Sequence, residues 1–299
     1  MVQFPPPWPK AEGYHRMWTR DDIARLQLRF GLSYHVAFAQ EAQLRVGLAG
    51  KRVLEVGGSL PREFALDFLG ASSWIAVEET QYWDEVARAD AAANKSWSSA
   101  VPLSDVSPDE LDQRYTVLTG RIEQSPSVFN NYFDVAFSIA AFEHIDRLPT
   151  ALDAIYRSLR PGGTLFSMFS PVWSSSIGHH LPVLQDADGK VFDQSLIPPW
   201  GHLLMRPSEM HQHLRRHTDA VTAGEVVYYI YNSPHINRLF VEDYLLYVSN
   251  SQFKVSQFSV TFAEHIDASL QKRLEHLHPG RTHFATQGIC LVLKRPENA

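Results

Sequence analysis

Carboxylates and glycines that follow short apolar runs are the first residues of this sequence that could bind a ligand. Residues 53–56 read Val-Leu-Glu-Val and continue as Gly-Gly-Ser, and a second apolar run at 74–77 ends in two glutamates. Glycine lets the backbone approach a ligand closely, and a helix that begins soon afterwards offers unpaired N–H groups. These patterns predict a ligand site built from Glu55, Gly57, Gly58, Ser59, Glu78 and Glu79.

Histidines form the second set of residues that could carry chemistry. His179 and His180 stand together after a serine-rich stretch, and His202 follows the sequence Pro-Pro-Trp-Gly. A histidine is suited to proton transfer because its ordinary pKa lies near neutral pH. We predict that these three face a substrate, that Trp200 forms an apolar wall beside it, and that one of the three or His144 is a general base. The alternative, that they cap helices or bind loop carbonyls, stays open.

A metal site is the less favoured interpretation of the same histidines. His211 and His213 add imidazoles that zinc or iron could use, but no ligand spacing such as His-x-x-x-His with a glutamate is present. Cys290 is the only cysteine, so an internal disulfide and a multi-cysteine zinc site are excluded. Its apolar surroundings predict a buried strand residue. We expect no metal.

The elements that must position these residues alternate along the chain. Helical patterns occur within 20–48, at 62–68 and at 148–159, the last ending at the sequence Arg-Pro-Gly-Gly. Short β-rich runs occupy 53–56, 74–77, 115–118, 133–138 and 164–169. Such alternation predicts an α/β fold with a doubly wound, mostly parallel sheet. In an open sheet of this kind, ligands bind beyond the carboxyl ends of the strands, where the glycines and glutamates fall.

The rhythm breaks after residue 170. Residues 171–232 are rich in Ser, His, Pro and Trp, and only 206–217 read as a polar helix, so we expect an inserted cap. An amphipathic helix is expected at 236–248, and strands at 253–262 and 289–294 predict an antiparallel pair at the sheet edge. We expect a single domain over 1–299, with an N-terminal helical segment (1–48), a cofactor-binding core (49–170), the cap (171–232) and a C-terminal helix with edge strands (233–299).

Four segments in this order resemble the motifs of class I S-adenosylmethionine-dependent methyltransferases. They are residues 53–58, 77–79, 133–138 running on to Phe-Glu-His-Ile at 142–145, and Leu-Arg-Pro-Gly-Gly at 159–163. The resemblance covers about residues 45–170 and the terminal strand pair. It implies a Rossmann-like fold, methyltransferase activity and S-adenosylmethionine as the cofactor. A nicotinamide-binding domain is less favoured, because the first turn lacks the Gly-x-Gly-x-x-Gly pattern.

The resemblance also implies roles for individual residues. Gly57 and Gly58 would line the methionine part of the cofactor, with Glu55 near its amino group. Glu78 or Glu79 would bind the ribose hydroxyls. The remaining implied positions are Arg121 and Ile122 beside adenine, and Ser138 and Ala140 at the pocket for the sulfonium methyl group. Two departures stand out: Gly-Gly-Ser-Leu-Pro replaces the usual Gly-x-Gly continuation, and Arg121, with Glu123 nearby, stands where the family often has an acidic residue.

Composition limits the kind of acceptor and the location. The formal net charge is -6, so the basic field typical of nucleic-acid binding is absent from the composition. No apolar run approaches the roughly 20 residues of a membrane span, and the first residues do not read as a secretory signal. We expect a cytoplasmic protein, compatible with a homodimer, that methylates oxygen or nitrogen of a small-molecule or sugar-like acceptor. The alternatives are a non-catalytic partner or regulatory protein that binds the cofactor, and an enzyme of this fold that does not transfer methyl.

Overall fold

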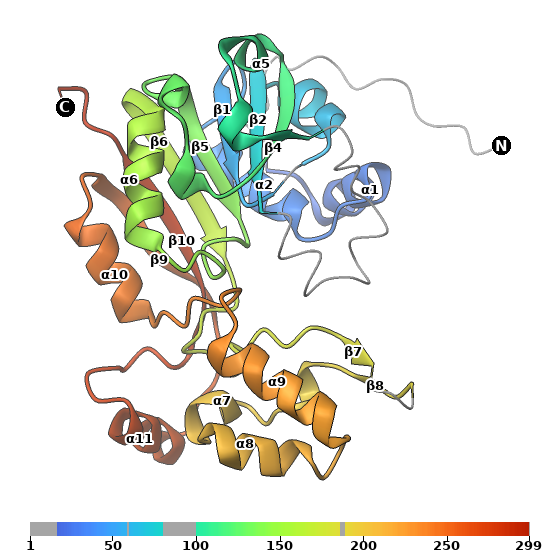
Figure 1. Cartoon of the computed structure of the whole chain (residues 1–299). Helices are drawn as coiled ribbons and strands as arrows, with labels where there is room; N and C mark the ends of the chain where they lie inside the picture. The colour runs from blue at the N-terminus through green and yellow to red at the C-terminus, as the bar shows by residue number, and fades with distance from the viewer. Residues whose placement is uncertain (1–16, 59, 80–99, 186–188, 299) are drawn as a thin grey trace.

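The chain forms a layered α/β upper part and a smaller, mainly helical lower lobe (Figure 1). This computed structural model describes residues 17–58, 60–79, 100–185 and 189–298. Among the helices in these ranges, none combines the length and the apolar character needed to cross a bilayer.

An eight-stranded sheet forms the centre of the upper part, in the order β3-β4-β2-β1-β5-β6-β10-β9. The strands from β3 to β6 pair in parallel, whereas β10 runs antiparallel to both β6 and β9. The predicted doubly wound sheet and the antiparallel edge pair are therefore confirmed. The strand bounds are β1 Arg52–Val56, β2 Ser73–Glu78, β3 Val101–Pro102, β4 Tyr115–Thr119, β5 Phe133–Ile139, β6 Leu159–Phe169, β9 Lys254–Ala263 and β10 Thr286–Lys294.

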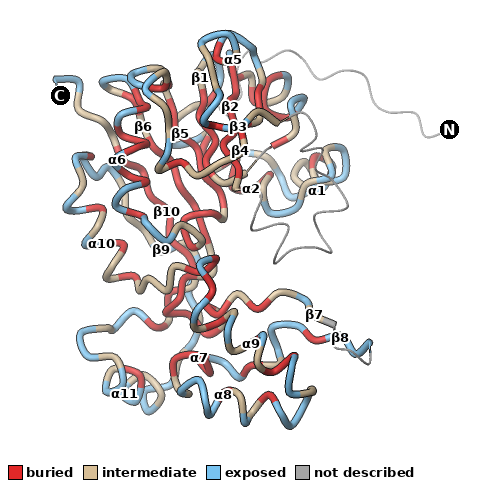
Figure 2. Tube along the Cα trace, viewed as in Figure 1, coloured by how far each residue is buried: buried red, intermediate tan, exposed pale blue. Residues whose placement is uncertain are grey.

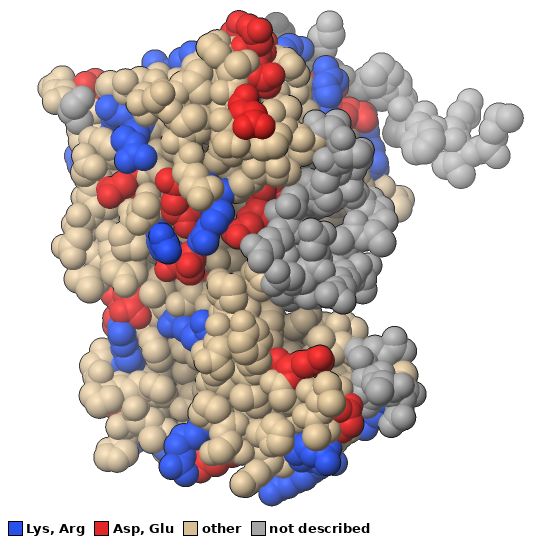
Figure 3. Space-filling view, viewed as in Figure 1, with Lys and Arg blue, Asp and Glu red and all other residues tan. Residues whose placement is uncertain are grey.

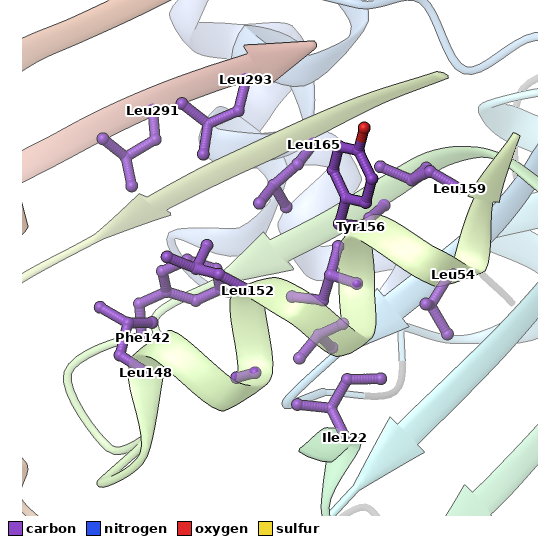
Figure 4. Packing of buried hydrophobic residues seen from close by; sticks show 14 of the residues in the cluster. Leu54, Ile122, Phe142, Leu148, Leu152, Tyr156, Leu159, Leu165, Leu291 and Leu293 are labelled. Carbon is purple, nitrogen blue, oxygen red and sulfur yellow. The ribbon is translucent and has the colours of Figure 1, made fainter. Parts of the chain in front are cut away.

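Helices cover both faces of this sheet because successive strand residues point to opposite sides. In β1, Leu54 joins the apolar cluster under α6, whereas Val53 joins the cluster under α2. Figure 4 shows α6 laid on its face of the sheet, with Leu152 and Tyr156 among the residues that fill the space. The helices of the upper part are α1 Arg20–Phe30, α2 His35–Arg45, the π-helix η1 Glu63–Phe68, α5 Pro108–Asp112, α6 Leu148–Ser158, α10 Val241–Asn250 and the short 3₁₀ turns η3 Leu103–Asp105, η4 Ile122–Gln124 and η5 Ser127–Phe129.

The first helix, α1, begins and ends at residues that favour helix ends. Thr19 and Asp22 form a capping box at the start of α1. Gly31 ends this helix with a left-handed backbone (φ 63°) and so separates α1 from α2. The link between the two helices lies at the carboxyl edge of the sheet, so the caps fix a wall of the cavity described below.

The Arg-Pro-Gly-Gly sequence that was predicted to end α6 lies within strand β6 instead. Residues 160–163 do not separate the helix from a later strand, because β6 already begins at Leu159, opposite Phe133 of β5. The next paired residue is Thr164, opposite Val135, so the four residues between bulge out of the sheet. Gly162 allows this with a φ of 78°.

The lower lobe has more regular structure than the sequence predicts. It contains β7 Leu184–Gln185, β8 Val191–Phe192, η6 Gln194–Leu196, α7 Gly201–Leu204, α8 Pro207–Leu214, α9 Ala220–Asn232 and α11 Ala268–Leu277. Only α8 corresponds to a predicted helix. Helices α9 and α11 were not predicted; α11 lies between the edge strands, so these strands are not joined by a tight turn. The lobe therefore draws on residues beyond 171–232, and its apolar core includes Leu274 and Phe284.

Residues 236–240 were predicted as the start of a helix but form the joint between the lobe and the sheet. The helix α10 begins only at Val241. The Asn237 amide donates to the carbonyls of Phe142 and Ile145 beyond β5. Arg238, with a left-handed backbone, donates to the carbonyls of Ile230, Ser233 and Ile236 around the end of α9. These side chains tie the end of α9 to the segment that follows β5.

Burial distinguishes the two parts of the molecule. Figure 2 shows continuous burial along the central strands, whereas the lobe's helices are exposed on their outer sides. Stability should therefore depend most on the apolar cluster between the sheet and α6.

Leu152→Ala tests this dependence. Leu152 is 1% exposed in the α6 cluster, and a large-to-small change there should lower the free energy of unfolding by about 2–5 kcal/mol. The matched change Leu28→Ala, at a residue 87% exposed on α1, should alter it by less than about 0.5 kcal/mol. Urea unfolding measures both, and equal effects would contradict this description of the core.

Candidate functional site

A cavity of about 720 Å³ opens at the carboxyl ends of the parallel strands. This volume lies within the range of small-molecule sites, roughly 300–1,000 Å³. Its walls come from the segments that follow β1, β2, β4, β5 and β6, and from the link between α1 and α2. The cavity is therefore where the sheet topology predicts a ligand.

The glycine turn after β1 is fixed by a buried carboxylate. Glu55 is 4% exposed, and its Oε2 accepts hydrogen bonds from the Leu60 amide (2.9 Å) and the Trp74 indole (2.5 Å). Gly57 has a φ of 75°, which favours glycine. Glu55, Gly57 and Gly58 line the cavity, but the contacts of Glu55 shape the turn. Ser59, also predicted here, lies outside the described residues.

Glu78, Glu79 and Arg121 line another wall of the cavity. Glu78 ends β2 and is 3% exposed. Arg121, beyond β4, pairs with Glu79 (3.9 Å) and Glu123 (3.2 Å) and also with Asp146. Three carboxylates thus surround one guanidinium. Burial raises the pKa of Glu79, and Arg121 opposes this shift.

The remaining predicted cofactor residues differ in position. Ile122 and Ala140 line the cavity. Ala140 has a φ of 47°, a strained backbone for a residue other than glycine. Ser138 does not line the cavity: it is fully buried, and its hydroxyl donates to the Val56 carbonyl at 2.9 Å. Its position indicates that it links β5 to β1 rather than edging the methyl pocket.

His144 and His180 are the two predicted histidines that line the cavity, with ring centroids 4.9 Å apart. Nδ1 of His144 lies 2.6 Å from the His235 carbonyl oxygen. A carbonyl only accepts, so Nδ1 carries the proton and Nε2 the lone pair of the neutral ring. Burial lowers the pKa of His144 to about 4 and the pKa of His180 well below its usual value. Both rings are therefore neutral at pH 7.

His180 has the same tautomer, for a similar reason. Its ring forms a hydrogen bond with the backbone of Pro171, which has only a carbonyl to offer. Its Nε2 is buried and has no hydrogen-bond partner among the described residues, so Nδ1 is the donor. Nε2 of His180 is thus a buried hydrogen-bond acceptor, and His180 lines the cavity.

His179, His202 and Trp200 lie away from this cavity, in the lower lobe, although the sequence predicts that they face the substrate. His179 is completely buried, and its Nδ1 accepts from the Leu181 amide. His202 donates from Nε2 to the Trp173 carbonyl at 2.8 Å and lines a separate cavity of about 380 Å³. Trp200 donates to two backbone carbonyls. Local packing within the lobe accounts for all three positions.

Sequence reasoning missed Glu143 as a site residue. Glu143 lines the cavity, is 2% exposed, and its Oε2 has no hydrogen-bond partner among the described residues. Burial raises its pKa to about 8, against hydrogen bonds from its own amide and that of Ser170. The signal was its place in the Phe-Glu-His-Ile segment after a strand, but there it could equally have faced solvent.

Other polar groups of the cavity come from segments far apart in sequence. Tyr34 contributes from the link between α1 and α2, His35 from the first residue of α2, and His235 from the segment just before the joint with the lobe. In the part of the chain that the structure describes, no three His, Cys, Asp or Glu residues are arranged to hold a metal ion. On the face shown in Figure 3, basic and acidic side chains are interspersed.

The family comparison bears directly on this edge of the sheet. A family described as a methyltransferase domain matches residues 70–167, which include β2, β4, β5 and most of β6. The matched residues include three of the four segments, 77–79, 133–145 and 159–163, that resemble class I S-adenosylmethionine-dependent methyltransferases. A methyltransferase domain implies S-adenosylmethionine as the cofactor, and the cavity lies at the carboxyl ends of the strands in the matched segment.

The solved structures to which this chain is similar are distant in sequence. An S-adenosylmethionine-dependent methyltransferase from Mesorhizobium loti is 16% identical, with 89% of this chain and 99% of that chain covered and a TM-score of 0.45. YcgJ from Bacillus subtilis is 13% identical, with coverages of 87% and 96% and a TM-score of 0.41. Likenesses of this size say nothing about the acceptor. No curated protein sequence matches the chain.

Gly57→Ala tests whether the glycine turn holds the cofactor. A Cβ there would lie 2.3 Å from the Cβ of Ala141, which also lines the cavity, so the turn must shift. We expect the affinity for S-adenosylhomocysteine, measured by calorimetry, to fall by at least about tenfold, which corresponds to about 1.4 kcal/mol.

Gly280→Ala is the matched control. Gly280 has a similar φ of 81°, but a Cβ there meets nothing within 4 Å. It should carry the same kind of backbone strain and leave the affinity unchanged. Equal affinities of both variants and the unchanged protein would remove the turn from the cofactor site.

Proposed function

We propose that this chain transfers the methyl group of S-adenosylmethionine to nitrogen or oxygen of a small-molecule acceptor that lies against His144 and His180. The observation that carries the proposal is one cavity that joins the glycine turn and the β2 carboxylates to this pair of imidazoles. The volume of about 720 Å³ supports a small acceptor rather than a macromolecule.

The residues at the strand ends fit the cofactor. The buried, cavity-lining carboxylate of Glu78 can accept hydrogen bonds from two ribose hydroxyls. Gly57 and Gly58 leave room for the methionine part, and Ile122 offers apolar surface to adenine. When bound, S-adenosylmethionine supplies a methyl group that is already activated by the sulfonium charge. The chain itself has to orient the acceptor and exclude water.

Of the four histidines predicted as candidate bases, only His144 and His180 line the cavity. Their backbone hydrogen bonds place the proton on Nδ1, so the lone pair of each ring is on Nε2. The buried Nε2 of His180 has no partner among the described residues and can accept a hydrogen bond from the acceptor. Their lowered pKa values make them weak proton acceptors at neutral pH. We therefore propose that they mainly orient the acceptor.

Several sequence predictions remain predictions. They are the cytoplasmic location, the homodimer and the exclusion of nucleic acid, the last supported by the net charge of -6. A non-catalytic cofactor-binding protein remains the alternative. A screen of small amines and alcohols with methyl-labelled cofactor separates the two functions. Labelled product would support the enzyme, and cofactor binding without any product would favour the alternative.

His144→Gln and His180→Gln test the orienting role. Each removes a cavity-facing imidazole and keeps a polar side chain of similar reach. We expect each change to lower kcat/KM for methyl transfer by about tenfold, the effect of one hydrogen bond, because a full general base would contribute about a hundredfold or more.

Cofactor affinity and an exposed histidine provide the controls. The affinity for S-adenosylhomocysteine should stay within about threefold in both variants, which corresponds to less than about 0.7 kcal/mol. His217→Gln, at an exposed position outside the cavity, should leave both quantities unchanged. Unchanged kcat/KM in His144→Gln and His180→Gln would remove the imidazoles from the acceptor site.

A further inference from the structure

Glu143 is a buried carboxylate for which the described residues provide only part of the hydrogen bonding. It is 2% exposed and lines the cavity, and its Oε2 has no partner in the described parts of the chain. A buried polar group without a partner costs about 1–3 kcal/mol, and a charged one costs more. A ligand that donates a hydrogen bond to this oxygen would remove that cost.

The surroundings of Glu143 place it beside the imidazole pair. The Ser170 amide donates to its carboxylate, and the next residue, Pro171, holds the ring of His180. His144 follows it directly in sequence. Tyr34, before α2, and Tyr244, on α10, also interact electrostatically with Glu143. No lysine or arginine is among the described residues that shift its pKa.

The other carboxylates of the cavity already have assignments. Glu55 holds the Leu60 amide and the Trp74 indole, and Glu79 pairs with Arg121. Glu78 is the carboxylate proposed for the ribose. Arg121 is the only lysine or arginine among the described residues that line the cavity, and three carboxylates already surround it. An anionic acceptor would therefore find no unmatched cation here, whereas a cationic one would find Glu143.

We propose that Glu143 selects an amine as the methyl acceptor, by binding its ammonium form and taking the proton that must leave before the nitrogen can be methylated. The inference rests on the proposed function, and it names the acceptor class that this function leaves open. It also makes Glu143, rather than a histidine, the catalytic base.

The ammonium gives one proton to the Glu143 carboxylate, which frees the nitrogen lone pair. The nitrogen forms a bond to the methyl carbon while the carbon–sulfur bond breaks, and the electron pair of that bond stays on sulfur. The positive charge passes from sulfur to nitrogen, and the products are a methylated ammonium and neutral S-adenosylhomocysteine.

Proton affinities favour Glu143 over the imidazoles for this role. Burial raises the pKa of Glu143 to about 8 and lowers the pKa of His144 to about 4. A base works best when its pKa lies near the working pH. His180 can still accept a hydrogen bond from the same nitrogen through Nε2. An alcohol acceptor fits less well, because the proton of an alcohol hydroxyl is harder to remove than that of an ammonium.

Ligand binding to the protein saturated with S-adenosylhomocysteine tests the acceptor class without relying on catalysis. Benzylamine, benzyl alcohol and benzoate share a skeleton, as do butylamine, butanol and butyrate. We expect the amines to bind at least about tenfold more tightly than the matched alcohols and carboxylates. Glu143→Gln should abolish this preference, Glu143→Asp should retain part of it, and Glu225→Gln, exposed on α9, should leave it intact.

The affinity for a permanent cation should change with pH in a direction that the proposal fixes. Glu143 is protonated below its raised pKa, so binding benzyltrimethylammonium must displace that proton. The affinity should rise by about tenfold for each pH unit from about pH 6 and level off above about pH 8. The affinity of Glu143→Gln should not change over this range. The melting temperature of each variant without the benzyl and butyl probes identifies any folding defect, and Glu143→Asp then provides the comparison.

The possible outcomes separate this inference from the proposed function. Amines that bind no better than alcohols or carboxylates, or equally well to Glu143→Gln, would overturn the inference. Glu143→Gln that loses affinity for S-adenosylmethionine but keeps it for S-adenosylhomocysteine would assign Glu143 to the sulfonium and would also overturn it. Failure of the unchanged protein to bind either cofactor form would instead overturn the proposed function.

Discussion

The buried carboxylate of Glu55 is the constraint on which the cavity depends. It joins the turn after β1 to β2 through the Leu60 amide and the Trp74 indole. A charge buried without such donors would be strongly unfavourable, so the turn and the second strand must keep this arrangement. The space around this turn then requires glycine at both positions, because neighbouring atoms leave no room for a Cβ. A Cβ at Gly57 would meet Ala141, and one at Gly58 would lie 2.8 Å from Oε1 of Glu55. The unusual Gly-Gly pair thus matches a turn folded around its own glutamate.

The sequence predicts the sheet well because its signals are local. Apolar runs such as 53–56 and 133–138 become central strands, and their ends meet at one edge as parallel pairing requires. Helix α9 was missed for an equally physical reason. Its Val-Val-Tyr-Tyr-Ile-Tyr segment has the β-branched and aromatic residues that favour strands, and packing of Val226 and Ile230 into the lobe overrides that preference.

The sequence could predict a site residue only where that residue's place at the end of a strand brings it to the cavity. Glu78 and Gly57 follow strands of the sheet, so they reach the cavity by topology. His179 and His180 are neighbours in sequence, yet one is buried in the lobe and the other lines the cavity, with a left-handed backbone at His180. Nothing local distinguishes them. The burial of Glu143 depends on α10 and on the segment after β6, which are distant in sequence.

The joint at Asn237 and Arg238 has a consequence for how this protein can diversify. Asn237 holds the segment that follows β5, and Arg238 holds the end of α9, so adjacent residues connect the sheet to the lobe. The lobe has its own apolar core, separate from the two clusters on the sheet. Loops and helices of the lobe can therefore be exchanged during evolution while this short connector persists. New acceptors could be recruited in that way onto an unchanged nucleoside-binding edge.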